Sequence, residues 1–217
     1  MTERLALFPL DTVLVPGMVL PLHIFERRYQ IMMRRVLAGD RRFGVLLVRR
    51  GNELDPDPDP YDVGTIAEVT DVVPLEGGRM NISTTGRQRF RVAALHHDQP
   101  YLSADIEVLA DGYQSTEQLL ELQEEVERLG LRYVTMMLTL THEQITHVQL
   151  PRDPLTLSYK VAALFVGSVH IEEAQQLLAS PTVEHRLYAE ILLLRREVAI
   201  MQRMSEMRDP GEQLSPN

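Results

Sequence analysis

The spacing of apolar residues along the chain changes near residue 110. Before that point the apolar runs are short, rich in β-branched residues, and separated by Gly, Pro and Asp, which is typical of strands. The predicted strands are Leu5–Leu10, Phe43–Arg49, Val63–Val73, Arg79–Thr85, Gln88–Leu95 and Tyr101–Leu109. Glycines at Gly77-Gly78 and Gly86 predict turns between neighbouring strands. The first half of the chain is therefore predicted to be a β domain.

Three segments interrupt this β pattern. Glu26–Ala38 carries apolar residues with the period of one helix face, so we expect a helix there. Pro16-Gly17 suits the two central positions of a type II turn. The uncharged segment Pro16–Phe25 contains two prolines, which disfavour a central strand and place it at a barrel edge. In Asp55–Pro60 every second residue is proline, which predicts an exposed, polyproline-like loop.

After Gly112 the period becomes helical. Ser115 and Gln118 have the spacing of a capping box, and helices are predicted over Thr116–Leu140, Leu155–Val166 and Ile171–Ala179. A last helix is expected to begin with Ser180 as N-cap and Pro181 at its first position. The predicted organisation is a β domain over residues 1–109, a hinge at 110–114, a helical domain at 115–208 and a flexible tail at 209–217.

Composition narrows the class of protein. The apolar fraction of 44% and charged fraction of 24% are those of a soluble globular protein. A net charge of −9 disfavours a nucleic-acid-binding surface, so we expect no DNA partner. The longest uncharged stretch, Thr12–Phe25, is shorter than the ~20 residues of a membrane span. The N-terminus lacks the length of a secretory signal. A cytoplasmic protein with no membrane partner is the expectation.

Candidate catalytic and metal-binding residues are few. Cysteine is absent from the chain, which removes thiolate nucleophiles and Cys-ligated metals. His142 and His147 flank a Glu, but their i, i+5 spacing turns the two rings about 140° apart on a helix. Lys160 is the single lysine, and no Gly-rich loop or nucleophile elbow accompanies it. The residues therefore predict no catalytic group, no cofactor and no metal site.

Several blocks resemble a known family. Residues 7–22 (LFPLDTVLVPGMVLPL), continued by His23–Tyr29, are similar to the opening of the substrate-binding N-terminal domain of Lon protease. Further blocks resemble the same family at Asp62–Ala67, Gly86–Val92, Pro100–Leu102 and Gln176–Leu187. Arg27 departs from the pattern, since the family usually has proline there. The similarity covers about residues 4–206.

The resemblance implies an α+β fold, in which a PUA-like twisted β-barrel with one helix is followed by an all-helical C-terminal bundle. It also implies a module that handles protein segments. Full Lon proteases add an ATPase and a Ser–Lys peptidase domain, and the sequence contains the motifs of neither. The expectation is a stand-alone, non-enzymatic form related to the ATP-dependent protease.

Two functions follow from this resemblance. The leading hypothesis is a protein- or peptide-binding module, an adaptor or chaperone-like factor whose partners are unfolded segments. The alternative is an RNA-binding module, which the PUA-like fold alone suggests. The hypothetical peptide site is a groove between the two domains, and its candidate lining residues are Leu20, Leu22, Phe25, Met136 and Met137. The competing interpretation places all five in ordinary core. The oligomeric state is not predictable from the sequence.

Overall fold

The computed structural model describes residues 3–55, 57–141, 149–167 and 170–208. It has the predicted α+β fold class. The chain divides into two compact units, one formed by Met1–Asp111 with Ala162–Ser180 and the other by Gly112–Val161 with Pro181–Asn217. No helix in the described part of the chain is long and apolar enough to cross a membrane.

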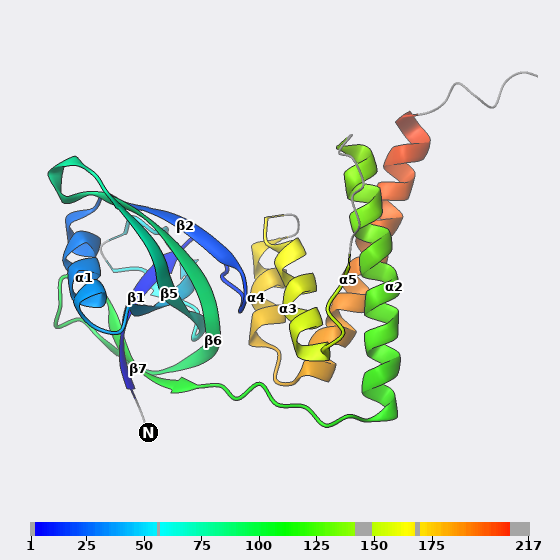
Figure 1. The fold of residues 1–217 in the computed structure, drawn as a ribbon, viewed down its shortest axis with the longest axis horizontal. Helices are drawn as coiled ribbons and strands as arrows, with labels where there is room; N and C mark the ends of the chain where they lie inside the picture. The colour runs from blue at the N-terminus through cyan, green and yellow to red at the C-terminus, as the bar shows by residue number, and fades with distance from the viewer. Residues whose placement is uncertain (1–2, 56, 142–148, 168–169, 209–217) are drawn as a thin grey trace, which may run out of the picture. The chain divides into compact units, whose positions relative to one another are not determined.

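The elements follow one another as in Figure 1. The strands are β1 (Glu3–Leu10), β2 (Val19–Ile24), β3 (Arg42–Arg50), β4 (Asp59–Pro60), β5 (Val63–Pro74), β6 (Met80–His96) and β7 (Ser103–Val108). The helices are α1 (Arg27–Ala38), α2 (Glu117–Leu140), α3 (Pro154–Phe165), α4 (Ile171–Ala179) and α5 (Val183–Arg208), with a 3-10 turn η1 (Glu76–Gly78). The main strands and all five helices confirm the predicted order.

The sheet of the first unit closes on itself. Its strands run in the order β1-β7-β6-β5-β3, and β1 pairs in parallel with β3, with Leu7 opposite Gly44. The remaining pairs are antiparallel. Because a closed ring leaves few unpaired backbone groups, the barrel satisfies most of its own hydrogen bonds. β2 lies outside the ring and pairs with the first half of β6, with Leu22 opposite Ile82.

Helix α1 packs its apolar stripe onto the barrel. The side chains of Met32 and Met33 are fully buried, as is Phe43 on β3. The ring of Phe8 stacks on that of Tyr29 at 4.0 Å between centroids, with the planes 19° apart. The helix and the strands thus share one core, as the 3.6-residue spacing predicts.

β6 is one long strand, where the sequence predicted two strands separated by a turn at Gly86. The backbone is close-packed there, because a Cβ on Gly86 would lie 2.4 Å from the carbonyl oxygen of Val15. Gly86 accepts a hydrogen bond from the N–H of Gly17 (2.8 Å) and donates one to the carbonyl of Met18 (2.9 Å). The glycine therefore marks a close approach of two backbones, and the predicted turn at this position is wrong.

The turn before β2 agrees with its prediction. Gly17 has φ = +80°, and the N–H of Met18 donates to the carbonyl of Val15 at 3.1 Å. A type II turn needs this positive φ at its third residue, which glycine adopts without strain. The turn directs the chain from the barrel into β2.

Two helix starts and one loop differ from their predictions. The hydroxyl of Thr116, and not that of Ser115, caps α2 by accepting from the N–H of Leu119 at 3.1 Å. α5 begins at Val183, and the hydroxyl of Thr182 accepts from the N–H of His185 at 3.3 Å. Part of the Asp55–Pro60 loop forms β4 against β3 with the side chains of Pro58 and Pro60 buried, so the loop is less exposed than predicted.

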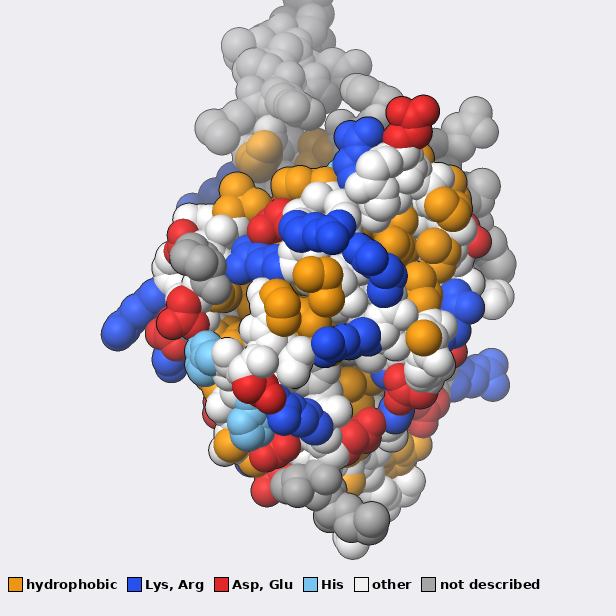
Figure 2. All heavy atoms as spheres, turned by 90° about the vertical axis from the view of Figure 1, so that its left-hand side faces the viewer, with side chains coloured by type: hydrophobic (Ala, Val, Ile, Leu, Met, Phe, Trp, Pro, Cys, Tyr) orange, Lys and Arg blue, Asp and Glu red, His pale blue; other side chains and the backbone are white. Residues whose placement is uncertain are grey.

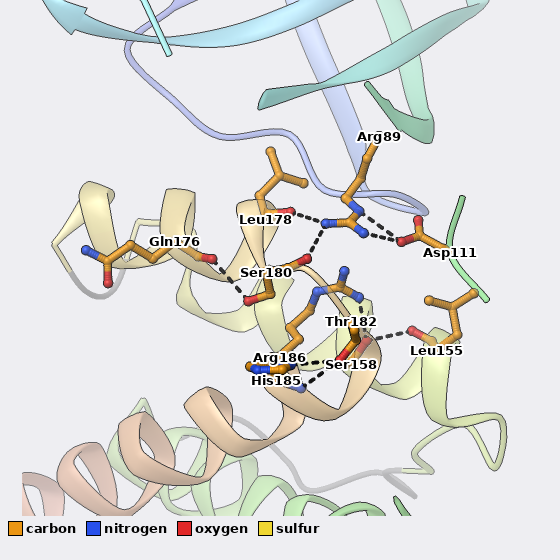
Figure 3. A network of polar contacts seen from close by, with 10 residues as sticks. All are labelled: Arg89, Asp111, Leu155, Ser158, Gln176, Leu178, Ser180, Thr182, His185 and Arg186. Atoms are coloured by element: carbon orange, nitrogen blue, oxygen red, sulfur yellow. Dashed lines mark hydrogen bonds and ion pairs between the residues drawn. The ribbon is translucent and has the colours of Figure 1, made fainter. Parts of the chain in front are cut away.

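Residues 162–180 pack with the barrel, whereas the sequence grouped them with the helical domain. The guanidinium of Arg89 on β6 donates to the carbonyls of Leu178 and Ser180, both at 2.7 Å, and forms an ion pair with Asp111 (Figure 3). The amide of Gln175 donates to the carbonyl of Val63 at 2.9 Å. A cation at the carboxyl end of α4 is also favoured by the helix dipole. Independent folding of 1–109 and 115–208, hinged at 110–114, stays a prediction.

Candidate functional site

The segment predicted to lie at a barrel edge does so. Among the described strands, β2 pairs with β6 alone. Pro21 has no N–H to donate, and Val19 exposes 61% of its surface. An edge strand offers backbone groups and alternating side chains to an extended polypeptide. β2 is therefore the starting point for a binding site.

A hollow of about 240 Å³ lies where β2 ends and α1 begins. Two large apolar side chains at this hollow are exposed to solvent, Phe25 by 53% and Leu54 by 59%. The ring of Phe25 lies beside that of His23 with centroids 5.7 Å apart. The lining residues are Phe8, Leu10, Pro21, Leu22, His23, Ile24, Phe25, Glu26, Tyr29, Glu53 and Leu54. We call this hollow the Phe25 pocket.

The wall of the Phe25 pocket is held by Arg28. Its Nε donates to Glu26 at 2.9 Å, and its terminal nitrogens donate to the carbonyls of Asp55 (2.7 Å) and Glu53 (3.0 Å). The guanidinium also lies 4.6 Å from the centre of the Tyr29 ring. These contacts fix the segment that carries Leu54 beside the start of α1. The pocket is thus built from parts that are far apart in sequence and joined by the contacts of Arg28.

Tyr29 adds a neutral phenol to the pocket lining. Burial raises the pKa of Tyr29 to about 12, against a smaller opposing effect of the Arg28 charge. The phenol therefore keeps its proton at neutral pH. The rest of the lining is mostly aromatic and aliphatic, with two glutamates, of which Glu26 is paired with Arg28. Such a surface suits an apolar side chain better than a charged one.

A second hollow, of about 340 Å³, shares Pro21, Leu22 and His23 with the Phe25 pocket. Its other lining residues are Asp71, Val73, Asn81, Ile82 and Ser83. His23 Nδ1 lies 2.6 Å from the side-chain oxygen of Asn81. The second half of β2 therefore lies between two hollows, which extends the accessible surface along the strand.

The five predicted site residues fall into two groups. Leu22 and Phe25 line the Phe25 pocket, while Leu20 is half-buried against the barrel core. Met136 and Met137 are half-buried on α2 and belong to the second unit. A groove lined by all five stays a prediction. Leu54 was missed, and its only sequence signal is a large apolar residue within an Asp- and Pro-rich stretch.

The residues tested for catalysis or metal binding lie apart. His96 contacts Asp105 at 2.9 Å and His97 contacts Asp57 at 3.2 Å. Within the described residues no group of three or more His, Asp or Glu could hold a metal ion. Lys160 is exposed on α3. His142 and His147 lie outside the described residues.

Comparison with known proteins identifies the family. The model of the ATP-dependent protease La (LON) substrate-binding domain matches residues 4–196. The chain belongs to this family. Lon protease of Anaeromyxobacter dehalogenans is 29% identical over 200 residues, which is 91% of this chain and 24% of that protein. Lon protease 2 of Myxococcus xanthus is 28% identical over 202 residues, 92% of this chain and 24% of that protein.

Solved structures of Lon N-terminal domains share the fold. A Lon N-terminal domain protein from Xanthomonas campestris matches with a TM-score of 0.60 and 24% identity, over 88% of this chain and 98% of that chain. The N-terminal domain of the Mycobacterium avium complex Lon protease matches with a TM-score of 0.63 and 18% identity, over 91% and 98%. The chain spans about a quarter of the length of the curated relatives, in the part that the family model describes as substrate-binding.

Proposed function

We propose that this chain is a non-catalytic module that binds unfolded or extended polypeptide segments, in an adaptor or chaperone-like role. The observation that carries the proposal is the Phe25 pocket. Two large apolar side chains, Phe25 and Leu54, stay exposed at its rim although the barrel core is well filled. Exposed apolar groups beside an open pocket are typical of binding sites. Membership of the Lon substrate-binding family supports the same class of ligand.

The pocket and the edge of β2 suit different parts of one ligand. The pocket offers apolar surface to a large side chain of the bound segment. The unpaired side of β2 offers carbonyl and N–H groups to its main chain, except for the missing N–H at Pro21. Main-chain contacts are common to all sequences, so this mode favours broad recognition of unfolded chains. Selectivity then comes from the side chain in the pocket.

The test uses a permanently unfolded protein, reduced and carboxymethylated α-lactalbumin, labelled for fluorescence anisotropy. We expect Phe25→Ser with Leu54→Ser to weaken binding by about tenfold or more, since each side chain contributes roughly 1 kcal/mol of apolar burial to the complex. The thermal midpoint should stay within about 4 °C, because both side chains are exposed in the unbound chain.

The matched control is Leu192→Ser on α5, which removes an equally exposed leucine (51%) from the second unit. It should leave the affinity unchanged. Unaltered binding by the double variant, or an equal loss in the control, would show that the pocket is not the site.

A further inference from the structure

The outer face of α1 carries a row of arginines. Arg27, Arg34 and Arg35 are exposed. Arg34 and Arg35 follow Arg27 by seven and eight residues, about two helical turns, so all three share one side of the helix. The twelve residues of α1 include four arginines and no acidic residue. Arg41 is exposed just beyond the helix, and its N–H donates to the carbonyl of Val36 at 3.0 Å. We call Arg27, Arg34, Arg35 and Arg41 the α1 arginine face.

These four guanidinium groups have no carboxylate partner within the described residues. The nearest acidic residues along the chain are engaged elsewhere, Glu26 by Arg28 and Asp40 by Arg42. The side-chain contacts of the arginine face go to neutral oxygens. These contacts are Arg34 to the carbonyl of Gln30 (3.3 Å), Arg35 to the hydroxyl of Tyr101 (3.1 Å) and to Gln99, and Arg41 to the carbonyl of Val69 (3.0 Å). The positive charge is thus held in place without being neutralised.

About half of the other exposed arginines in the described part of the chain form ion pairs. Five that are equally open to solvent each form an ion pair, namely Arg4, Arg49, Arg87, Arg128 and Arg195. Exposed arginines without such a partner also occur on other elements, for example Arg132 on α2 and Arg203 on α5. α1 differs because three exposed arginines without a carboxylate partner among the described residues lie on one face of the helix. This basic face belongs to a chain whose net charge is −9.

The surroundings of the arginine face are apolar as well as basic. Figure 2 views the side of the molecule on which α1 lies in Figure 1, and it shows basic side chains gathered around hydrophobic ones. Ile31 lies half-buried within the row of arginines, and Phe25 precedes the helix by two residues. A nucleic acid presents regularly spaced phosphate charges, which an evenly basic surface would match better than this mixed one. The net negative charge of the chain would also repel it. A polypeptide with both acidic and apolar side chains complements this mixed surface.

We propose that the α1 arginine face docks acidic residues of a bound polypeptide whose apolar side chain occupies the Phe25 pocket. This inference rests on the proposed function and names its ligand class, which is an apolar anchor flanked by Asp or Glu. α1 is about 18 Å long at 1.5 Å per residue, which matches five or six residues of an extended chain. The acidic flank extends along the helix, and the anchor lies at the end where α1 begins.

The test compares two fluorescent peptides that share a central Leu-Phe-Leu segment and differ in flanks of four glutamates or four glutamines on each side. Binding is measured by anisotropy at about 50 mM salt, where screening is weak. The variant is Arg27→Glu with Arg34→Glu. Within the described residues the guanidinium of Arg27 forms no hydrogen bond or ion pair, and that of Arg34 forms one hydrogen bond to its own helix. The matched control is Arg132→Glu with Arg203→Glu, which changes the net charge equally on the second unit.

The unaltered chain should bind the glutamate-flanked peptide about tenfold more tightly than the glutamine-flanked one. The preference should disappear in the Arg27/Arg34 variant and remain in the control. It should also fall as salt is raised to 0.5 M, since exposed ion pairs are screened.

Four outcomes would overturn the inference. Equal binding of both peptides refutes the arginine face and leaves the proposed function standing. A preference that survives in the Arg27/Arg34 variant places the acidic selectivity elsewhere. Tighter binding of a single-stranded oligonucleotide of equal charge, lost in the same variant, assigns the face to nucleic acid. If neither peptide binds, the proposed function fails together with this inference.

Discussion

Arg89 connects three parts of the first unit through one side chain. It is 2% exposed, it pairs with Asp111, and it donates to two carbonyls at the end of α4. Burying an arginine costs desolvation free energy. The planar guanidinium offsets that cost by donating hydrogen bonds to several acceptors at once. The position of α4 against β6 depends on this cation.

We expect Arg89→Ala to lower the free energy of unfolding by about 3–5 kcal/mol, because it removes a buried cation from one carboxylate and two carbonyls. Urea denaturation followed by circular dichroism measures the change. Arg91→Ala, two residues along the same strand and exposed, is the matched control and should cost no more than about 0.5 kcal/mol. Similar losses in both variants would mean that the contacts of Arg89 contribute little.

Glu190 is the unusual titratable residue of the second unit. Its side chain is fully buried, and neither carboxyl oxygen has a hydrogen-bond partner within the described residues. Burial raises its pKa well above the ordinary value of 4.5, and the charge of Arg186 offsets part of that effect. The guanidinium of Arg186 lies 4.2 Å from the Tyr159 ring centre and donates to Ser158 at 3.0 Å.

A raised folded-state pKa means that the folded chain holds this proton more tightly than the unfolded chain. The stabilisation is complete below pH 4.5 and is lost as the pH rises toward the folded-state value. We expect Glu190→Gln to remove this contribution, so that the variant gains stability relative to the original chain as pH increases, by at most about 1.4 kcal/mol per pH unit. Urea denaturation of both chains between pH 5 and 8 measures this difference. A difference independent of pH would contradict the assignment.

The candidate site was only partly predictable residue by residue. Phe25 and Leu22 stand in an uncharged segment with two prolines, and that pattern predicts an exposed strand edge. Leu54 has no periodic neighbours, so nothing local indicates that Arg28 holds its segment beside α1. The arginine face could be located on the helix from sequence, but its lack of carboxylate partners depends on the folded arrangement.

At the scale of elements, β6 shows how tertiary contact decides the role of a glycine. The sequence presents Gly86 as a turn signal, yet the strand continues through it because the loop before β2 crosses close by. Propensity describes what glycine permits, and packing decides which of those conformations is used.

We expect Gly86→Ala to destabilise the chain by about 1–3 kcal/mol, since the new methyl group would meet the Val15 backbone at 2.4 Å. Gly112→Ala is the matched control, because nothing lies within 4 Å of its added carbon. Thermal unfolding of the two variants gives the comparison. Equal midpoints would show that the crossing loop moves aside at little cost.

Helices were the most predictable elements and their first residues the least. α4 occupies the predicted residues, and α1 starts one residue later than predicted. The period of apolar residues extends over many positions, so it survives local exceptions. A cap depends on one hydroxyl, and each of these two helix starts offers two candidates close together. They are Ser115 and Thr116 before α2, and Ser180 and Thr182 before α5. Backbone geometry selects between them.

At the scale of the whole molecule, the two compact units do not follow the order of the chain. Residues 162–180 belong with the barrel, although along the sequence they separate the two segments of the second unit. The sequence shows that α4 has an apolar face but not which partner covers it. Family resemblance supplied the α+β architecture, and the buried contacts of Arg89 and Gln175 explain the assignment of α4.

We propose that polypeptide segments bind at β2 and the Phe25 pocket. Hydrogen–deuterium exchange of the full chain, with and without saturating carboxymethylated α-lactalbumin, tests it directly because amide protection reports local opening and coverage. We expect slower exchange in residues 19–29 and 52–55, with little change in α5. Protection confined to α2 and α5, with unchanged exchange around Phe25, would contradict it.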